Sequence, residues 1–330
     1  MATTLIRPTE CIETQSLRGD AWGIASVGAD SSPYNGEGVV VAVLDTGIDR
    51  LHPAFAGMDI QERDFTGESI GDADGHGTHC AGTIFGRDIN FQRIGVARGV
   101  SRAVIGKVIG QNGGNSQMIF EGLQWAVQQR ANVISMSLGF NFPGEVENKV
   151  KKGWPADLAT SQALEAYRGN IRLLDALMNL FKAQAAFNSS PLVIAAAGNE
   201  SRRSVNDQYK IAASLPAAAD GVISVAAVSR SGSRYHVADF SNSFAHLSAP
   251  GVNVLSAWPG GTLKALNGTS MACPHVAGVA ALWWQHLQER KAPNIASAVS
   301  SSLTAHARAD CFTNGFDASD YGHGLITCPQ

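Results

Sequence analysis

Continuous runs of β-branched and other apolar residues recur along the chain and alternate with stretches whose apolar positions stand three or four residues apart. The continuous runs predict strands buried on both faces, and the wider spacing predicts amphipathic helices. The predicted strands are residues 38–44, 102–109, 132–136, 191–197 and 221–228, and the predicted helices are residues 118–129, 158–187 and 271–288. This alternation predicts an α/β fold, a three-layer sandwich with a mostly parallel central sheet and helices on both faces.

The chain shows no internal boundary after its first segment. Residues 22–330 contain no linker rich in Pro, Gly or Ser, no repeat and no low-complexity tract, so we predict a single domain there. Residues 1–21 are polar and irregular, and we predict that they form an N-terminal extension.

Composition narrows the classes of partner. The 330 residues are 45% hydrophobic and 16% charged, as in a compact globular protein. With 25 Lys+Arg against 28 Asp+Glu the net charge is -3, and no basic stripe is present, so we expect no nucleic-acid partner. No apolar run could span a bilayer, and the N-terminus lacks the apolar core of a secretory signal, so we expect no membrane partner and a cytoplasmic location. The alternative is a secreted protein whose signal and propeptide are not part of the printed sequence.

A serine at the start of the last predicted helix is a candidate nucleophile. Ser270 lies in the segment NGTSMACPH, where a loop of small residues turns into an apolar helix. A serine hydroxyl is a weak nucleophile at neutral pH, so it needs a base, an orienting acid and an oxyanion site. The positive end of the helix would face an anion formed at this serine.

Three other residues fit those roles. Asp45 follows the first predicted strand and Asn199 follows the fourth, so both fall at the carboxyl edge of the sheet, where active residues of such folds collect. His76 lies in DGHGTHCAG, where glycines run into a short helix. Each of these residues alone would be an ordinary turn, cap or structural residue, and only their combination indicates a site.

The segments around Asp45, His76 and Ser270, in that order, resemble the subtilisin-like serine proteases, the subtilases, over about residues 22–327. The order is the known one of subtilisin. The resemblance implies a serine endopeptidase that cleaves a peptide or protein substrate through an acyl-enzyme intermediate. Ser270 would attack, His76 would take its proton, Asp45 would orient His76, and the Asn199 amide would receive the oxyanion. The alternative is a non-catalytic peptide-binding module with the subtilase fold.

The resemblance also implies where the substrate lies. The S1 pocket, which holds the P1 side chain before the cleaved bond, would have one wall of Ser137, Leu138 and Gly139, a second of Ala196, Ala197 and Gly198, and Gly113 and Gly114 as an edge for the substrate strand. These small residues leave a wide slot, so we predict a large apolar P1 residue. Glu200 beside the pocket could also admit Lys or Arg. Ser116 stands where several relatives carry a bulky residue, which predicts an open S4 pocket.

We expect no required cofactor and no metal among the site residues. Four possible ligands, Asp72, Asp74, His76 and His79, lie close together, but the His-Glu-x-x-His spacing of helical zinc sites is absent. Subtilases often bind structural calcium, and one family ligand is an acidic residue just after a His-Pro pair. Here Ala54 follows His52 and Pro53, so the usual calcium site lacks that ligand.

Two segments depart from simple subtilases. The stretch between Gly139 and Asn199 is far longer, with an insertion and extended helix at about residues 140–188. We predict a charged, Pro-bearing loop at residues 140–155 that narrows substrate access. The segment LIRP at residues 5–8 resembles the Leu-Ile-Pro segment with which intracellular subtilisins block their own cleft. Residues 1–21 are therefore a candidate inhibitory segment, and a frayed terminus is the alternative.

The chain has five cysteines. Cys80 follows His76 by four residues and Cys273 follows Ser270 by three, so both thiols are expected to pack behind the catalytic pair as buried, free groups. Cys311 and Cys328 could close a C-terminal loop as a disulfide, and in a cytosolic protein they would stay reduced.

Overall fold

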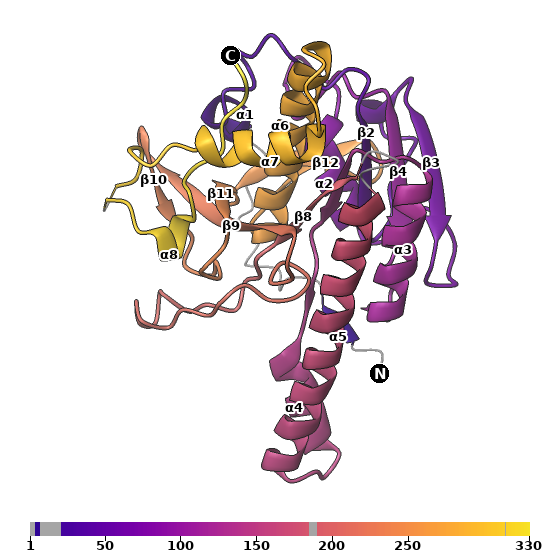
Figure 1. The fold of residues 1–330 in the computed structure, drawn as a ribbon, viewed down its shortest axis with the longest axis vertical. Helices are drawn as coiled ribbons and strands as arrows, with labels where there is room; N and C mark the ends of the chain where they lie inside the picture. The colour runs from indigo at the N-terminus through magenta and orange to yellow at the C-terminus, as the bar shows by residue number, and fades with distance from the viewer. Residues whose placement is uncertain (1–3, 7–20, 185–189, 314) are drawn as a thin grey trace.

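An eight-stranded sheet forms the middle layer of the molecule. The computed structural model describes residues 4–6, as backbone only, and residues 21–184, 190–313 and 315–330. The strands run in the order β10, β9, β8, β6, β2, β4, β3, with β11 paired to β9, and every pairing is parallel except β9 with β10 (Figure 1). Their bounds are β2 Val40–Asp45, β3 Asp59–Asp64, β4 Arg102–Lys107, β6 Val133–Met136, β8 Leu192–Ala196, β9 Val222–Ser231, β10 Arg234–Val237 and β11 Leu247–Pro250.

The five predicted strands are all present, as β2, β4, β6, β8 and β9, and the predicted fold class is confirmed. The sequence pattern missed β3, β10 and β11. In β3 and β10 most side chains are exposed or half-buried, because both strands lie at sheet edges. An edge strand needs no continuous apolar run, so the pattern gave no signal there.

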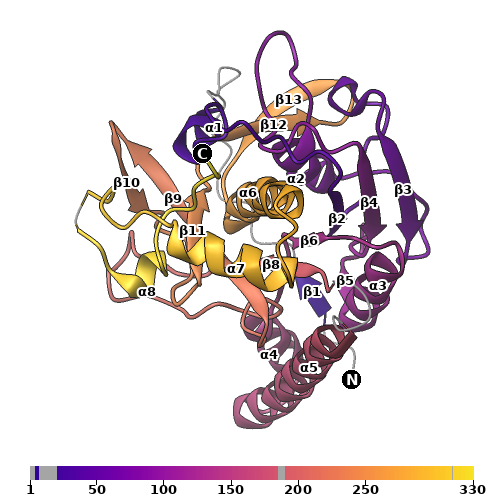
Figure 2. The same ribbon diagram turned by 45° about the horizontal axis from the view of Figure 1, so that its top comes forward.

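Helices cover both faces of the sheet (Figure 2). Side chains alternate along β2: Val41 and Val43 belong to the core with α2 (His76–Phe85), α6 (Thr269–Glu289) and α7 (Ile295–Ala305). Ala42 and Leu44 belong to the core with α3 (Ser116–Gln128) and α5 (Ala156–Gln184). The three predicted helices are thus present, although residues 185–187 of the second lie outside the described residues.

The predicted loop at residues 140–155 is instead largely helical, as α4 (Phe142–Lys151). Asn141 caps this helix by accepting the N–H of Gly144 at 2.7 Å, and two ion pairs, Glu145 with Lys149 and Glu147 with Lys151, connect successive turns. The prediction was wrong because α4 buries no residue and so has no apolar stripe to reveal it. Together, α4 and the first half of α5 project from the body as a helical hairpin (Figure 1).

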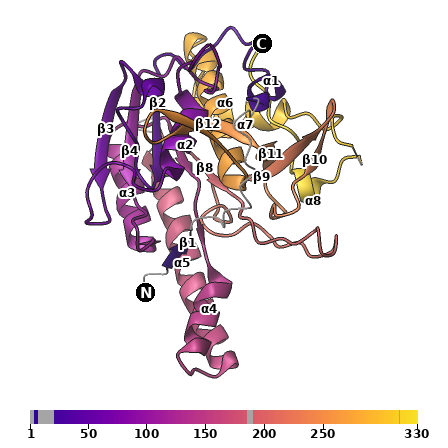
Figure 3. The ribbon, with the colours of Figure 1, turned by 180° about the vertical axis from the view of Figure 1, so that it is seen from behind.

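A second, three-stranded sheet lies at the base of this hairpin. Its central strand is β1 (Thr4–Ile6), which runs antiparallel to β5 (Gly114–Asn115) on one side and to β7 (Gly139–Phe140) on the other. Leu5 stands opposite both Gly114 and Phe140. Figure 3 shows β1 beside α5. Residues 4–6 are therefore not a frayed end.

The remaining elements are small. They are α1 (Trp22–Ser26), the 3₁₀ turn η1 (Pro53–Phe55), the hairpin β12 (Val254–Trp258) with β13 (Thr262–Leu266), and α8 (Ala318–Tyr321). Cys311 and Cys328 are free thiols, so the disulfide considered from the sequence does not form. Within the described ranges, no helix is both long and apolar enough to cross a bilayer.

Candidate active site

Asp45 and His76 meet where the end of β2 faces the start of α2. A Cβ atom at Gly77 would lie 2.2 Å from the carbonyl oxygen of Gly47, so only glycine allows the helix to come this close. His76 Nδ1 lies 2.7 Å from Asp45 Oδ1, and both side chains are buried. In the neutral imidazole the carboxylate thus holds the proton on Nδ1 and leaves Nε2 as a proton acceptor.

The two neighbouring histidines differ in electrostatics. Burial alone would lower the pKa of His76, but the Asp45 carboxylate raises it, and the pKa ends well above the usual 6.5. His79 has no carboxylate partner, so burial and the nearby His76 lower its pKa to about 3. Its Nε2 lies 2.9 Å from the carbonyl oxygen of Val254 and 3.1 Å from that of Lys264. His79 is therefore the packed, hydrogen-bonded neighbour expected from the sequence.

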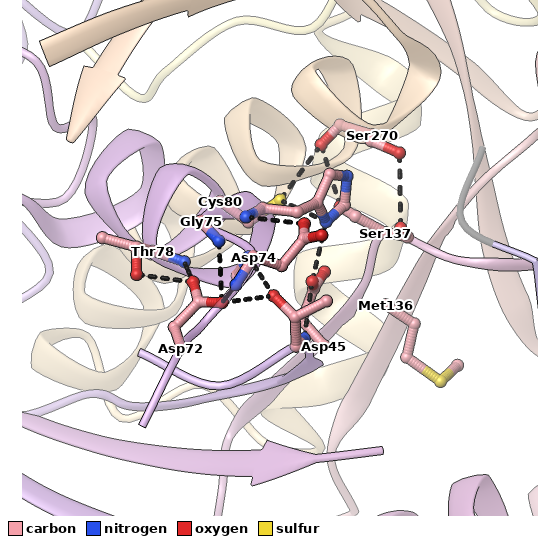
Figure 4. Close-up of polar contacts among 12 residues, drawn as sticks. Asp45, Asp72, Asp74, Gly75, Thr78, Cys80, Met136, Ser137 and Ser270 are labelled. Carbon is pink, nitrogen blue, oxygen red and sulfur yellow. Dashed lines mark hydrogen bonds and ion pairs between the residues drawn. The ribbon is translucent and has the colours of Figure 1, made fainter. Parts of the chain in front are cut away.

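Asp72 organises the loop that carries His76, a role that the sequence did not reveal. Its Oδ1 accepts hydrogen bonds from the Thr46 hydroxyl and from the backbone N–H groups of Asp74 and Gly75. Its Oδ2 accepts both the N–H and the hydroxyl of Thr78, at 2.8 and 2.6 Å (Figure 4). Both carboxylate oxygens of Asp72 are thus engaged by donors of the protein itself.

Ser270 is the second residue of α6, and its backbone is held by an unusual contact. Pro274 has no N–H to donate to the Ser270 carbonyl four residues earlier. That carbonyl instead accepts the Ser137 hydroxyl at 2.9 Å and the Cys80 thiol at 3.6 Å (Figure 4). The Ser270 hydroxyl donates to the Ser137 carbonyl at 3.3 Å, and no hydrogen bond joins it to His76 in this state.

Asn199 presents an unused donor beside the start of α6. Its Oδ1 accepts the N–H and the hydroxyl of Thr269, at 2.9 and 2.8 Å, which fixes the side-chain amide. Its Nδ2 is buried and, among the described residues, has no hydrogen-bond partner. Leaving a buried donor unpaired typically costs about 1–3 kcal/mol. This donor is therefore positioned to receive an anion next to Ser270.

The two predicted S1 walls leave the sheet side by side. They follow β6 and β8, which pair in parallel with Met136 opposite Ala195. At the predicted substrate edge, Gly113 pairs with Gly110 and Gly114 pairs with β1. Ser214 and Asn242 lie against the two predicted walls: a Cβ atom at Gly139 would lie 3.0 Å from Ser214 Oγ, and one at Gly198 would lie 2.5 Å from Asn242 Nδ2. Nothing in the local sequence pattern marks these two residues.

A cavity of about 560 Å³ lies between α3 and α5, near the predicted S4 position. Ser116 lines it at the start of α3, with Phe120 from α3 and Gly169 and Leu173 from α5. A small residue at position 116 is consistent with an open pocket there.

The described residues do not fit the family's usual calcium site at the His-Pro pair. Ala54 is fully buried, and its N–H donates to His52 Nδ1 at 3.1 Å, so this position supplies no carboxylate oxygen. Asp45, His76 and Cys80 place ligand-type atoms within 4.8 Å of one another. However, Nδ1 of His76 is committed to Asp45, and burial raises the pKa of Cys80, so its thiol stays protonated.

A parallel α/β sheet that brings an Asp-His pair, a serine at a helix start and a free amide donor to one edge is typical of serine hydrolases. The sequence matches the Subtilase family over residues 36–324, and the chain belongs to this family. It is 35% identical to subtilisin DY of Bacillus licheniformis, over 92% of this chain and 96% of that protein. It is 36% identical to the major intracellular serine protease of Bacillus subtilis (strain 168), over 75% and 68%. An intracellular serine protease of Paenibacillus polymyxa is 35% identical, over 75% and 67%. Membership of the family makes this chain a serine endopeptidase.

The buried thiols give a test of the packing behind the site. Cys80 Sγ lies 3.9 Å from His76 Nδ1, whereas Cys273 Sγ contacts Ser135 Oγ at 3.5 Å. We expect an aryl mercurial to inactivate the enzyme through Cys80, because a bulky group there displaces the imidazole. Burial raises the pKa of Cys273 to about 12 and that of Cys80 as well, so iodoacetamide, which needs the thiolate, reacts slowly.

The measurement is peptidase activity with mass mapping of the modified thiols. In the presence of the mercurial, Cys80→Ala is expected to stay active. Cys273→Ala, the matched control, retains Cys80 and is therefore expected to be inactivated by the mercurial like the unsubstituted protein. Retained activity in the unsubstituted protein with both thiols modified contradicts this arrangement.

Proposed function

We propose that this chain cleaves internal peptide bonds with Ser270 as the nucleophile, His76 as the general base and Asp45 as the group that orients His76. The observation that supports this most is the buried 2.7 Å contact between His76 Nδ1 and Asp45 Oδ1. With Nδ1 engaged, Nε2 takes the Ser270 proton once the hydroxyl turns away from the Ser137 carbonyl. Asp45 stabilises the imidazolium that forms.

The negative charge on the attacked carbonyl oxygen falls between two donors. One is Asn199 Nδ2, which is held in place by Thr269 and otherwise unpaired. The other is the backbone N–H of Ser270, which lies in the first turn of α6 and therefore has no carbonyl of the helix to bond. His76 then gives its proton to the leaving amine. In the second half of the reaction, His76 takes a proton from a water molecule that attacks the acyl-enzyme, and Ser270 is released.

The substrate main chain is proposed to lie as an added strand between β5 and β7. The position of β1 supports this, because β1 pairs there on both sides in the antiparallel direction. The P1 side chain then enters the slot between the two S1 walls, where small residues favour a large apolar side chain. Glu200 lies beside this slot, so Lys or Arg is the second candidate.

The same position supports an inhibitory role for residues 1–21. A substrate strand and β1 cannot both occupy the space between Gly114 and Gly139, so the N-terminal segment competes with substrate. A short tether holds such a segment at an effective concentration of about millimolar.

Fluorophosphonate labelling tests the proposed nucleophile. We expect label on the unsubstituted chain, no label on Ser270→Ala, and no change when EDTA is added, because no step uses a metal. Label retained on Ser270→Ala would rule out this serine. No label on the folded chain, even with residues 1–18 removed, favours the non-catalytic module instead.

Removal of residues 1–18 tests the inhibitory segment. We expect kcat/KM for a short peptide to rise about tenfold, because the tethered competitor is gone. Leu5→Pro should act in the same direction, since proline cannot donate to either neighbouring strand. A chain that lacks only residues 1–3 retains β1 and is the matched control. Equal activity in all four proteins contradicts the inhibitory role.

A further inference from the structure

A mostly apolar cavity of about 310 Å³ lies where the base of the S1 slot meets the helical hairpin. Eight of its twelve lining residues are apolar, so the cavity suits an apolar side chain. The slot contributes Glu200, Ser214 and Asn242, and the hairpin contributes Phe142, Pro143, Leu164 and Tyr167.

The cavity borders the proposed slot, because Ser214 lines the cavity and also lies against both walls. A Cβ atom at Gly139 would lie 3.0 Å from Ser214 Oγ, and one at Gly198 would lie 3.1 Å from it, so this hydroxyl stands between the two walls. The backbone N–H of Ser214 donates to the Ala197 carbonyl at 2.9 Å, and the next carbonyl, of Leu215, accepts the Phe140 N–H at 2.9 Å. The segment therefore joins both walls and forms the floor over which a long P1 side chain must pass.

Glu200 lines this cavity and is held in place by Asn242. Its Oε2 accepts the side-chain N–H of Asn242 at 2.6 Å, and Asn242 Oδ1 accepts the backbone N–H of Glu200 at 3.1 Å. Asn242 is fully buried, so this pair is held rigidly. The carboxylate is thus engaged by the protein, and the space beyond it is lined mainly by rings and aliphatic groups.

The hairpin lines the side of the cavity away from the S1 walls with Phe142, Pro143, Leu164 and Tyr167. Leu164 and Tyr167 are three residues apart on α5 and so share one face of the helix. The Phe142 ring meets the Tyr167 ring edge to face, with centroids 5.9 Å apart, which fixes the ring at the end of the passage. Leu164 is 47% exposed, and a side chain entering the cavity from the slot would cover part of it.

We propose that the α4–α5 hairpin forms the end wall of the S1 pocket, and that Leu164 and Tyr167 set the length of the longest apolar P1 side chain. This proposal rests on the proposed function, because it requires the slot to bind P1. From the sequence we expected a loop at residues 140–155 to narrow substrate access. The proposal gives the inserted residues a different role, because here they line the pocket that binds the P1 side chain.

The test compares kcat/KM for peptides that differ only at P1, which is Ala, Phe, biphenylalanine or Lys. The full-length chain is used, because the ratio between two peptides does not depend on the fraction of chains whose cleft is free. The variants are the double change Leu164→Ala with Tyr167→Ala, and the opposite change Tyr167→Trp. Leu180→Ala is the control, since Leu180 is an exposed leucine of the same helix that does not line the cavity.

We expect the double variant to raise the biphenylalanine-to-Ala ratio about tenfold, the size of effect that pocket length produces. Tyr167→Trp should lower the Phe-to-Ala ratio severalfold, and Leu180→Ala should leave both ratios within about twofold. Unchanged ratios in both hairpin variants overturn the proposal, as does a preference for Lys over Phe in the unsubstituted chain. Fluorophosphonate labelling of each variant separates the failures. If the variants are labelled but their P1 profile is unaltered, only the end-wall proposal is contradicted. If the protein shows no label and no turnover, the proposed function itself is contradicted.

Discussion

The buried hydrogen bond between Asp45 and His76 is the contact on which the rest of the site depends. A carboxylate taken out of water is costly unless it is paired, and here the imidazole is its side-chain partner, since Oδ2 has none among the described residues. The close approach of Gly77 to Gly47 brings the two groups together, and the five hydrogen bonds to Asp72 hold the intervening loop. The close approach at Gly77 and the hydrogen bonds of Asp72 therefore both act to position one imidazole.

The start of α6 is likewise fixed by a few hydrogen bonds from neighbouring segments. Pro274 leaves the Ser270 carbonyl without its helical donor, and the S1 wall supplies one through Ser137. Thr269, the residue before the proposed nucleophile, donates two hydrogen bonds to Asn199, the proposed oxyanion donor. Nucleophile, donor and substrate wall are thus joined through backbone groups of adjacent residues. A shift in any one of them moves the others.

The sequence predicted those features whose signal is local. Continuous apolar runs marked the buried strands, and short motifs marked Asp45, His76, Asn199 and Ser270 because each follows a strand or starts a helix. It failed where the signal depends on distant contacts or on solvent. The helix α4 has no fully buried residue, and the contacts of Asp72, Ser214 and Asn242 arise only when segments far apart in the chain meet. The pairing of β1 is likewise a property of the folded cleft.

The α4–α5 hairpin is an insertion that lies outside the proposed catalytic residues. The second half of α5 packs on the sheet through Leu174, Leu177 and Phe181, which anchors the element, and the first half is left free to border the cleft. The proposed catalytic residues lie at strand ends and helix starts, and the proposed S1 walls follow β6 and β8. The inserted segment adds only the proposed end wall of that pocket, so it could change selectivity without changing the catalytic residues.

The central claim is that a preformed donor at Asn199 stabilises charge that develops only in the transition state. Steady-state kinetics of Asn199→Ala test it most directly. The expected result is a loss of about 10²–10³-fold in kcat with little change in KM, the size known for the corresponding donor in subtilisin. An unchanged kcat in the folded variant, or a loss confined to KM, would contradict the claim.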